Sequence, residues 1–426
     1  MKKVYKSSLL IIAMAAGAFH ASAQRDNRLN EEHVVSVVVN ESEATADEVE
    51  KAFRQNAPES PNDNAMPRFA IVGKNNKFYL GLGAQFLGEA VFDWGDKMPS
   101  AVLMVPSSIE PSAPGNRSDL RFGWQSSNIY MNIVALPNTE DQIGVFLKLN
   151  FFGKDNSVKV YHLYAKYRGL QVGYNTGLFT DGAAMPFTLD FEDAAGYPFL
   201  TMFNASWTQH FTKNLTGAIG IDAPTVSFTC SSTTEEVNQR IPTVPMYLQY
   251  GWGDGSHVRL SGMVRPLMYR DLTAAKNRVL TGGGVQLSGV TPVVGNLSAQ
   301  FNAVYGKGIA SYIQDDNGLG FDAVATTHSG EMKMPETMGL TGALTYQFSD
   351  KVSSNLVYSH VTNWFDSDAR MAADTYRYGD YVAANVIWAI NKFASVGLEY
   401  DYGHRMSTSG TSRHTNRLQC QMAVTF

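Results

Sequence analysis

The sequence has very few cysteines and no long apolar segment beyond its first residues. Only Cys230 and Cys420 are present, and two cysteines so far apart cannot form the disulfide framework of a small secreted domain. No run after residue 23 approaches the roughly 18 apolar residues that indicate a transmembrane helix, so helical membrane spans are excluded. Helical periodicity is also rare after residue 60, although a soluble domain of this length usually contains several helices.

The common motifs of catalysis and cofactor binding are missing as well. The nine histidines form neither an HExxH pattern nor the Cys/His spacing of a zinc site. No GxSxG sequence and no phosphate-binding GxxxxGK[ST] loop occurs. We therefore predict no catalytic residues, no metal site and no cofactor.

The first residues have the pattern of an export signal. Lys2, Lys3 and Lys6 precede the short apolar run 9–19, and Ala21-Ser22-Ala23 provides a small-residue cleavage site. We expect residues 1–23 to be a cleaved signal peptide. Their removal takes away three lysines and no acid, which leaves 31 Lys and Arg against 39 Asp and Glu, a net charge of −8. This balance argues against a nucleic-acid partner, which requires a basic surface.

Residues 24–68 differ in composition from the rest of the chain and are predicted to be a short extension and linker. The sequence HVVSVVVN (33–40) predicts one strand, and Thr45 to Glu48 matches a capping box that opens a short helix. Residues 56–67 are rich in Pro, Asn and Ser and predict a linker. The segment is too small to fold around a core of its own.

The sequence from about Phe78 to the end alternates apolar and polar residues in segments of about ten residues, as transmembrane β-strands do. In one such segment Tyr161, Leu163, Ala165 and Tyr167 are assigned to the lipid face. The same alternation recurs in further segments, among them 145–151, 258–265, 340–348 and 396–402. In lipid every backbone polar group needs a partner, so strands of this kind survive only in a closed barrel.

Turn and loop signals complete the predicted architecture. Short turns are predicted at 154–157, 212–214, 253–256 and 349–351, and longer loops at 95–117, 313–335 and 403–415. Short turns at one end and long loops at the other are typical of outer-membrane barrels. We predict an all-β, antiparallel transmembrane barrel of about sixteen strands over residues 69–426, with a short N-terminal periplasmic extension.

The last strand ends on an aromatic residue. Leu418, Cys420, Met422, Val424 and Phe426 share one face of the final segment. A terminal Phe on an amphipathic strand is similar to the signal that barrel-assembly machinery recognises. Together with the export signal, it predicts insertion into the outer membrane of a Gram-negative bacterium, with outer-membrane lipid as a partner.

Three segments resemble the DcaP-like trimeric porins. They are FAIVGKNNKFYLGLGAQF (69–86), VYHLYAKYRGLQVGYNTGLFTDGAAMPFTLDFEDAAG (160–196) and LQCQMAVTF (418–426), of which the second is the specific one. The resemblance implies a sixteen-stranded barrel, a homotrimer, an inward constriction loop within 160–196 and carboxylate solutes. The extension of that family often forms a coiled coil, whereas residues 24–66 contain no sustained heptads.

A porin selects solutes by its width and by the charges at its narrowest point. The segment 180–199 is the predicted constriction loop, and it carries the acidic residues Asp181, Asp190, Glu192 and Asp193. By alternation, the predicted pore-lining cations are Arg121, Lys148, His162, Lys166, Arg168, Arg259 and Arg265. The excess of cations favours small anionic solutes. An acidic loop in solvent, and cations paired with neighbouring acids, remain the simpler alternatives. Pro266 is expected to mark a bulge, after which the alternation would shift.

These features predict a porin for passive diffusion of small hydrophilic, anionic solutes. One alternative is an outer-membrane lipid hydrolase using an exposed Ser/His pair, for which Ser359 and His360 are the candidates. Another is a plugged structural or adhesive barrel. Gly123, Gly251 and Gly397 on the inner face argue for open space instead.

Overall fold

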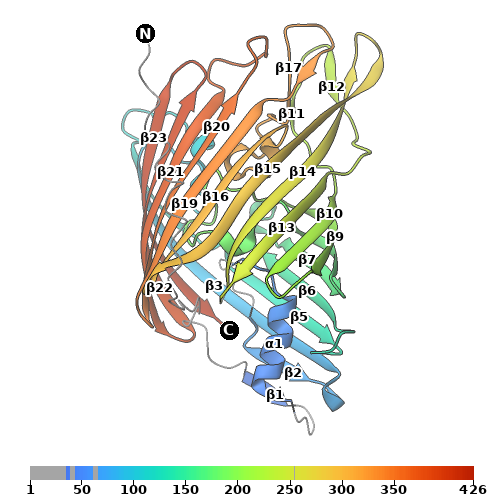
Figure 1. The fold of residues 1–426 in the computed structure, drawn as a ribbon. Coiled ribbons are helices and arrows are strands. Elements are labelled where there is room, and N and C mark those ends of the chain that lie inside the picture. The colour runs from blue at the N-terminus through green and yellow to red at the C-terminus, as the bar shows by residue number, and fades with distance from the viewer. Residues whose placement is uncertain (1–34, 39–43, 61–65, 254) are drawn as a thin grey trace.

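The computed structural model describes residues 35–38, 44–60, 66–253 and 255–426. The expected signal peptide lies outside these residues. Most of the described chain forms one large twisted sheet that closes into a barrel (Figure 1). The strands of its wall are β3 (Phe78–Gly95), β4 (Ser118–Gly123), β5 (Asn128–Ala135), β6 (Ile143–Asn150), β7 (Lys159–Tyr167), β8 (Leu170–Thr176), β9 (Thr201–His210), β10 (Leu215–Asp222), β12 (Thr234–Glu236), β13 (Val244–Trp252), β14 (Ser256–Asp271), β15 (Lys276–Val294), β16 (Leu297–Lys307), β19 (Glu336–Ser349), β20 (Val352–Trp364), β21 (Tyr376–Asn391), β22 (Ala394–Ser407) and β23 (Ser412–Thr425).

The barrel wall is antiparallel throughout, and its first and last strands meet. β4 and β5 both pair with β3, and β12 and β13 both pair with β14, so each of these two sets occupies one position in the wall. β23 pairs with β3 from Thr425 opposite Gln85 to Thr415 opposite Gly95. Within the described residues the barrel therefore has sixteen strand positions, which confirms the predicted fold class and strand number.

The alternation of side chains follows the predicted two-sided pattern. In β14, Leu260 and Val264 are exposed on the outer face, while Arg259 and Ser261 are buried on the inner face. The pairing of β14 with β15 continues through Pro266 opposite Thr281 without a shift, so the bulge expected at Pro266 is wrong.

The two ends of the barrel differ in the length of their connections (Figure 1). At the short-turn end the strands are joined by 136–142, 168–169, 211–214, 253–255, 295–296, 350–351 and 392–393. At the long-loop end they are joined by 96–117, 151–158, 177–200, 223–243, 272–275, 308–335, 365–375 and 408–411.

Two sequence predictions about these connections are wrong. The turn 154–157 lies at the long-loop end, within the connection between β6 and β7. The segment 403–415 is mostly strand, because β22 and β23 continue into it and leave only 408–411 as their connection.

Short elements of structure occur within the connections. A small sheet at the long-loop end contains β11 (Phe228–Thr229), β17 (Ala323–Ala325) and β18 (Met332–Lys333). The single-turn 3-10 helices are η2 (Lys74–Asn76), η3 (Pro106–Ser108), η4 (Lys154–Asn156), η5 (Gly182–Ala184), η6 (Ala310–Tyr312) and η7 (Gln314–Asp316).

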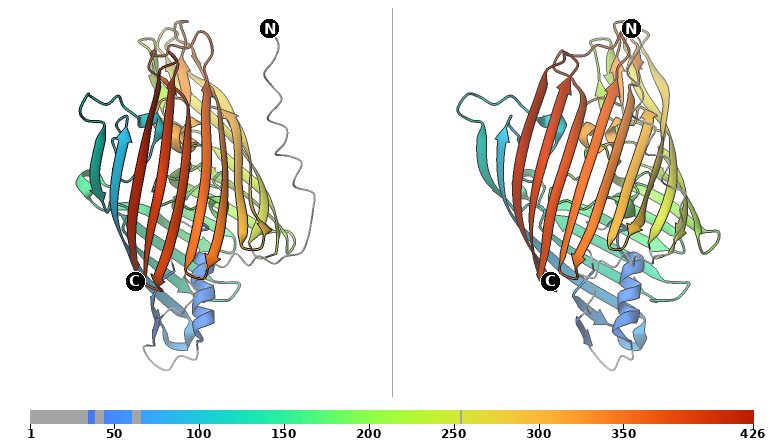
Figure 2. Two further views of the ribbon diagram at one scale, coloured as in Figure 1. Left: turned by 90° about the vertical axis from the view of Figure 1, so that its left-hand side faces the viewer. Right: turned by 60° about the vertical axis from the view of Figure 1, so that its left-hand side comes forward.

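The N-terminal extension lies at the short-turn end, beside the C-terminus (Figure 2). It consists of β1 (Val35–Val38), α1 (Ala46–Asn56) and β2 (Phe69–Val72), and β2 pairs with both β1 and β3. The predicted capping box is present, because the Thr45 side chain accepts from the Glu48 amide and the Glu48 carboxylate accepts from the Thr45 amide. Among the described residues no helix has the length and apolarity needed to cross a membrane.

The helix α1 has no core of its own and packs on the barrel. Its residues Val49, Ala52 and Phe53 are buried against Tyr79 of β3 and Val134 of β5, with Ala70 and Val72 of β2 beside them. The apolar face of the helix is thus covered by inward-facing side chains of the wall. This packing holds the end of the helix, and the start of the following segment, next to the inner wall.

Candidate functional site

The barrel encloses a cavity of about 1750 Å³. Its lining includes inward-facing residues of the wall, residues of the 177–200 loop and residues 55–56 and 58–60 of the extension. It also includes Arg168, Asp350 and Lys392, which lie in or next to turns of the short-turn end. The cavity therefore reaches from the short-turn end into the middle of the barrel.

The 177–200 loop folds into the barrel and docks on the opposite wall. The amides of Leu189 and Asp190 donate to the Glu399 carboxylate of β22 at 2.7–2.9 Å. The Leu189 side chain packs on Gly397, where an added Cβ would lie only 2.7 Å from Leu189 Cδ1. Because the loop leaves from β8 and returns to β9, its contact with β22 requires it to cross the lumen.

Two further loops fold inward and pack against the first. The Met104 amide of the 96–117 loop donates to Asp190 Oδ1 at 2.8 Å. The Phe199 amide donates to the Tyr312 carbonyl of the 308–335 loop at 2.7 Å. The long-loop half of the lumen is therefore narrowed by three interlocked loops, whereas the sequence predicted only one.

The four acidic residues predicted for the constriction divide into two groups. Asp190, Glu192 and Asp193 line the cavity. Asp181 is fully buried and accepts from His257 Nε2 at 2.8 Å and from Ser288 Oγ at 2.7 Å. Burial alone would raise the pKa of Asp181, but the nearby Arg259 guanidinium and these hydrogen bonds hold that pKa well below its usual range. Asp181 is thus an anchor within the barrel and not a residue of the cavity wall.

Burial changes the charge of the three acidic residues that line the cavity. It raises the pKa of Asp190 to about 6 and, with the repulsion from Asp190, that of Glu192 to about 8. Burial also raises the pKa of Asp193 well above its usual range. Near neutral pH the loop therefore carries less negative charge than its composition suggests.

Four of the predicted cations lie along the wall of the cavity: Lys148 on β6, His162 and Lys166 on β7, and Arg259 on β14. Lys148 and His162 are direct cross-strand partners. The Arg259 guanidinium lies 4.2 Å from the centre of the Tyr247 ring and 3.7 Å from Asp181. The cavity is therefore lined by cations on β6, β7 and β14.

Two of the other predicted cations lie outside the cavity lining, and the third, Arg168, lies at its mouth. Arg265 is buried under the 308–335 loop, where it pairs with Asp322 at 2.5 Å. Arg121 faces inward but pairs with Asp93 and donates to the Pro99 carbonyl, outside the cavity lining. Arg168 lies in the β7–β8 turn at the mouth of the cavity and pairs with the exposed Asp141 at 2.7 Å. Alternation predicts the face of a strand, but it does not predict which inward residues a folded loop will cover.

An aromatic group next to Lys148 was missed by the sequence analysis. The pairing of β6 with β7 shifts after Lys148, which leaves Tyr161 as an extra residue in β7. Tyr161 consequently turns inward and lies near Phe191 and Phe199 of the 177–200 loop, with ring centres 6.0 and 6.5 Å apart. Its assignment to the lipid face is wrong, because alternation cannot detect an inserted residue.

Two of the three inner-face glycines, Gly123 and Gly397, mark contacts with loops instead of open space. A Cβ at Gly123 would lie 2.3 Å from Val102 of the 96–117 loop, and one at Gly397 would meet Leu189. Gly251 lies close to the β13–β14 turn at the short-turn end. The use of Gly123 and Gly397 as signs of open space is therefore wrong, whereas a Cβ added at Gly251 would meet no atom closer than 3.5 Å.

The side chains of Ser359 and His360, the pair considered for lipid hydrolysis, lie on opposite faces of β20. Ser359 is buried on the inner face of β20, where its hydroxyl accepts from the Gly196 amide at 2.8 Å. His360, its neighbour in the strand, points to the other face and bonds to Asp380 at 2.9 Å. Ser359 and His360 therefore cannot act together.

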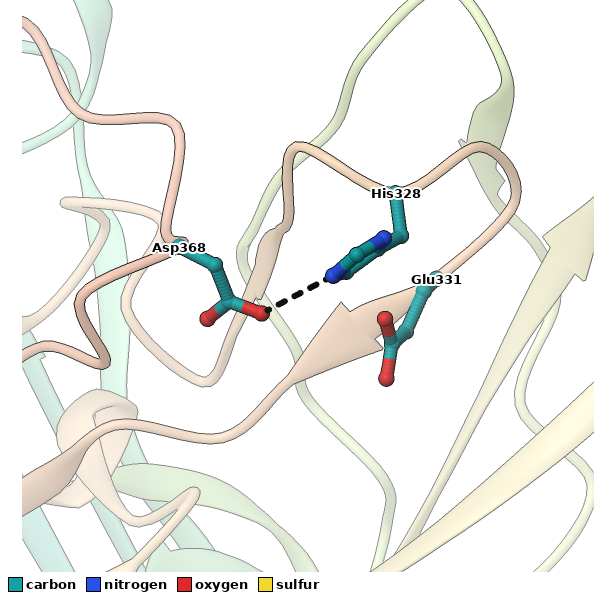
Figure 3. Close-up of side chains that lie close together, drawn as sticks. All are labelled: His328, Glu331 and Asp368. Carbon is teal, nitrogen blue, oxygen red and sulfur yellow. Dashed lines mark ion pairs between the residues drawn. The ribbon is translucent and has the colours of Figure 1, made fainter.

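One group of side chains at the long-loop end has the composition of a metal site. His328 and Glu331 of the 308–335 loop and Asp368 of the 365–375 loop lie together (Figure 3), with possible ligand atoms within 4.8 Å of one another. However, Lys333 Nζ lies 2.9 Å from the Asp368 carboxylate, so this carboxylate already has a positively charged partner. The sequence motifs did not predict this group, and we assign no metal to it.

Comparisons with known proteins identify the fold. No family model and no curated protein matches the sequence. The structure is similar to the outer-membrane channel DcaP of Acinetobacter baumannii, with 17% identity and a TM-score of 0.71 over 83% of this chain and 99% of that chain. It is also similar to OmpT of Vibrio cholerae (12% identity, TM-score 0.53, 83% and 99%) and to the anion-selective porin from Comamonas acidovorans (9% identity, TM-score 0.53, 82% and 100%). The fold is therefore that of the Gram-negative outer-membrane porins, and the predicted likeness to DcaP-like porins is confirmed at the level of the fold.

Proposed function

We propose that the protein is an outer-membrane porin that allows small polar solutes, preferentially anions, to diffuse passively. The observation that carries this proposal is the cavity inside a closed barrel, narrowed by an inward loop and lined by Lys148, His162, Lys166 and Arg259. The outer face of the barrel is rich in exposed apolar side chains, which suits contact with lipid.

The preference for anions follows from the ionisation of the lining groups. The cavity is lined by six Lys and Arg residues and by six Asp and Glu residues. Because burial raises the pKa of Asp190, Glu192 and Asp193, these three carboxyl groups lose part of their charge near neutral pH. The remaining excess of positive charge raises the local concentration of anions.

The experiment is conductance of the purified protein in a planar lipid bilayer across a salt gradient. A porin gives stepwise conductance, and an anion preference gives a reversal potential of the corresponding sign. Replacement of Lys148 by Ala should shift the reversal potential towards cations. The matched control is Lys276→Ala, because Lys276 is exposed at the start of β15 and outside the cavity lining. Absence of conductance would contradict the proposal and favour a plugged structural barrel.

We also propose a homotrimer that is held together by the barrel walls. The fold is shared with OmpT of Vibrio cholerae, of which a trimer form has been solved. In this chain the helix α1 packs on the inner face of its own barrel wall, at the short-turn end, and not on the outer face. The apolar face of α1 is therefore already covered within the protomer, which leaves the exposed apolar side chains of the wall as the proposed subunit contacts.

A further inference from the structure

The N-terminal extension does not stop at the mouth of the barrel. Asn56, the last residue of α1, is buried, and its carbonyl accepts from the Tyr164 hydroxyl of β7 at 2.7 Å. Its side-chain amide donates to Asn132 of β5 at 2.7 Å. Gly144 of β6 leaves room for this contact, since an added Cβ would lie 2.1 Å from Asn56 Oδ1. The end of the helix is thus fixed to the inner wall.

The residues after the helix cross the cavity. Lys166 Nζ of β7 donates to the Ala57 carbonyl at 3.2 Å, at the helix C-terminus where a cation is favourable. Two residues further, Glu59 Oε2 accepts from the Arg259 guanidinium of β14 at 3.2 Å. Four wall positions, those of β8, β9, β10 and β13, separate β7 from β14. A segment that touches both strands must span the lumen between them.

The same segment meets the constriction loop. Ser60 Oγ lies 3.9 Å from Met185 Sδ of the 177–200 loop. A Cβ added at Gly182 would lie 3.3 Å from the Ser60 nitrogen and 3.6 Å from its Cα. Gln55, Asn56, Pro58, Glu59 and Ser60 all line the cavity. The extension therefore forms part of the narrow region together with the loop.

Glu59 changes the charge that a solute meets at Arg259. The Arg259 side chain is 4% exposed, whereas that of Glu59 is 61% exposed. Arg259 also lies 3.7 Å from the buried Asp181, so the single guanidinium faces two carboxylates. A solute that approaches this wall contacts the Glu59 carboxylate before the cation beneath it.

We propose that residues 55–60 form a strap across the pore and that Glu59 is a selectivity-determining residue. This inference rests on the proposed porin function. The strap narrows the passage on the β7–β14 side, and Glu59 reduces the attraction of the cavity for anions. The N-terminal extension thus takes part in permeation, in addition to its contacts at the mouth.

The first test is bilayer conductance of Glu59→Gln, with Glu50→Gln as the matched control. Glu50 pairs with Arg54 on α1 and is outside the cavity lining. We expect Glu59→Gln to shift the reversal potential towards anions and Glu50→Gln to leave it unchanged. If the wild type conducts but Glu59→Gln has the wild-type reversal potential, the inference is overturned. If the wild type does not conduct, the proposed function itself fails.

The second test shows whether the strap is in place in the membrane. Ser60→Cys and Gly182→Cys are combined in a background where Cys230 and Cys420, both exposed and unpaired, are replaced by Ser. Oxidation of isolated outer membranes should form the 60–182 disulfide, detected as a mobility change that a reducing agent reverses. Failure of the two thiols to cross-link in folded protein would overturn the inference, independently of any conductance.

Discussion

The carboxyl groups of Asp190 and Glu192 make the charge of the lumen depend on pH. Their pKa values are raised to about 6 and about 8, so both are neutral at lower pH and become negative as the pH rises through this range. We expect the proposed preference for anions to be strongest below about pH 6 and to decrease up to about pH 8. Reversal potentials between pH 5 and pH 9 measure this change.

A matched pair of variants identifies the residue responsible. Glu192→Gln should abolish the upper part of the pH dependence, whereas Glu110→Gln, on the 96–117 loop outside the cavity lining, should retain it. A pH-independent reversal potential in the wild type would contradict the prediction.

Gly397 is the contact point of the constriction loop on β22. A Cβ at this position would overlap the Leu189 side chain, so Gly397→Val should push the loop away from the wall and increase conductance. The control is Gly342→Val on β19, because nothing lies within 4 Å of a Cβ added at Gly342. Single-channel conductance and protease sensitivity of the 177–200 loop measure the effect. Equal conductance of both variants would show that Leu189 does not hold the loop.

At the scale of single residues, the sequence predicts which face of the wall a side chain occupies better than it predicts which groups surround that side chain. The inward direction of Lys148, His162 and Lys166 follows from period-two alternation, because one face of the wall contacts lipid. The inward direction of Tyr161 could not be predicted, because the β-bulge at this residue is not visible in the alternation of apolar and polar residues. The covering of Arg265 could not be predicted either, since it depends on a loop some fifty residues away that pairs it with Asp322.

At the scale of elements, the docking of α1 provides a test of stability. Phe53 is fully buried between the helix and the wall. Phe53→Ala should destabilise the docked helix by about 3–5 kcal/mol, the usual range for truncating a buried Phe. Hydrogen exchange of the amides of residues 46–56 should increase, whereas Lys51→Ala, at an exposed position of the same helix, should have little effect. Unchanged exchange in Phe53→Ala would contradict the observed packing.

The sequence predicted the helix but not its position. The capping box of Thr45 and Glu48 is a local signal, and it correctly marked where α1 begins. The apolar side chains of α1 showed that something must cover them, but not that the barrel's own interior does so. The contacts of Glu59 and Ser60 are with strands and loops more than a hundred residues away in the sequence, so no local sequence pattern predicts them.

At the scale of the whole molecule, the site of trimer assembly can be tested by deletion. Because α1 packs on the inner face of its own barrel wall, removal of residues 24–66 should leave a trimer that is sensitive to heat. Native electrophoresis with and without heating, beside the full chain, measures this. If the shortened protein ran as a monomer, the extension would be the trimerisation element.

The architecture of the barrel was predictable because lipid and water impose it. A wall with one apolar face and one polar face must alternate, and a strand edge cannot remain unpaired in lipid. The repetition of this pattern from Phe78 to Phe426 therefore predicted closure and the approximate number of strands. The interlocking of the long loops was not predictable, because their contacts follow from the shape of the finished barrel.

The pairing of β3 with β23 has a consequence for biogenesis. Gln85 pairs with Thr425, so the edge of β3 receives its partner only when β23 is available to pair with it. Until then the nascent barrel has two unpaired edges, which readily pair with other chains. The protein must therefore be kept from aggregating throughout export.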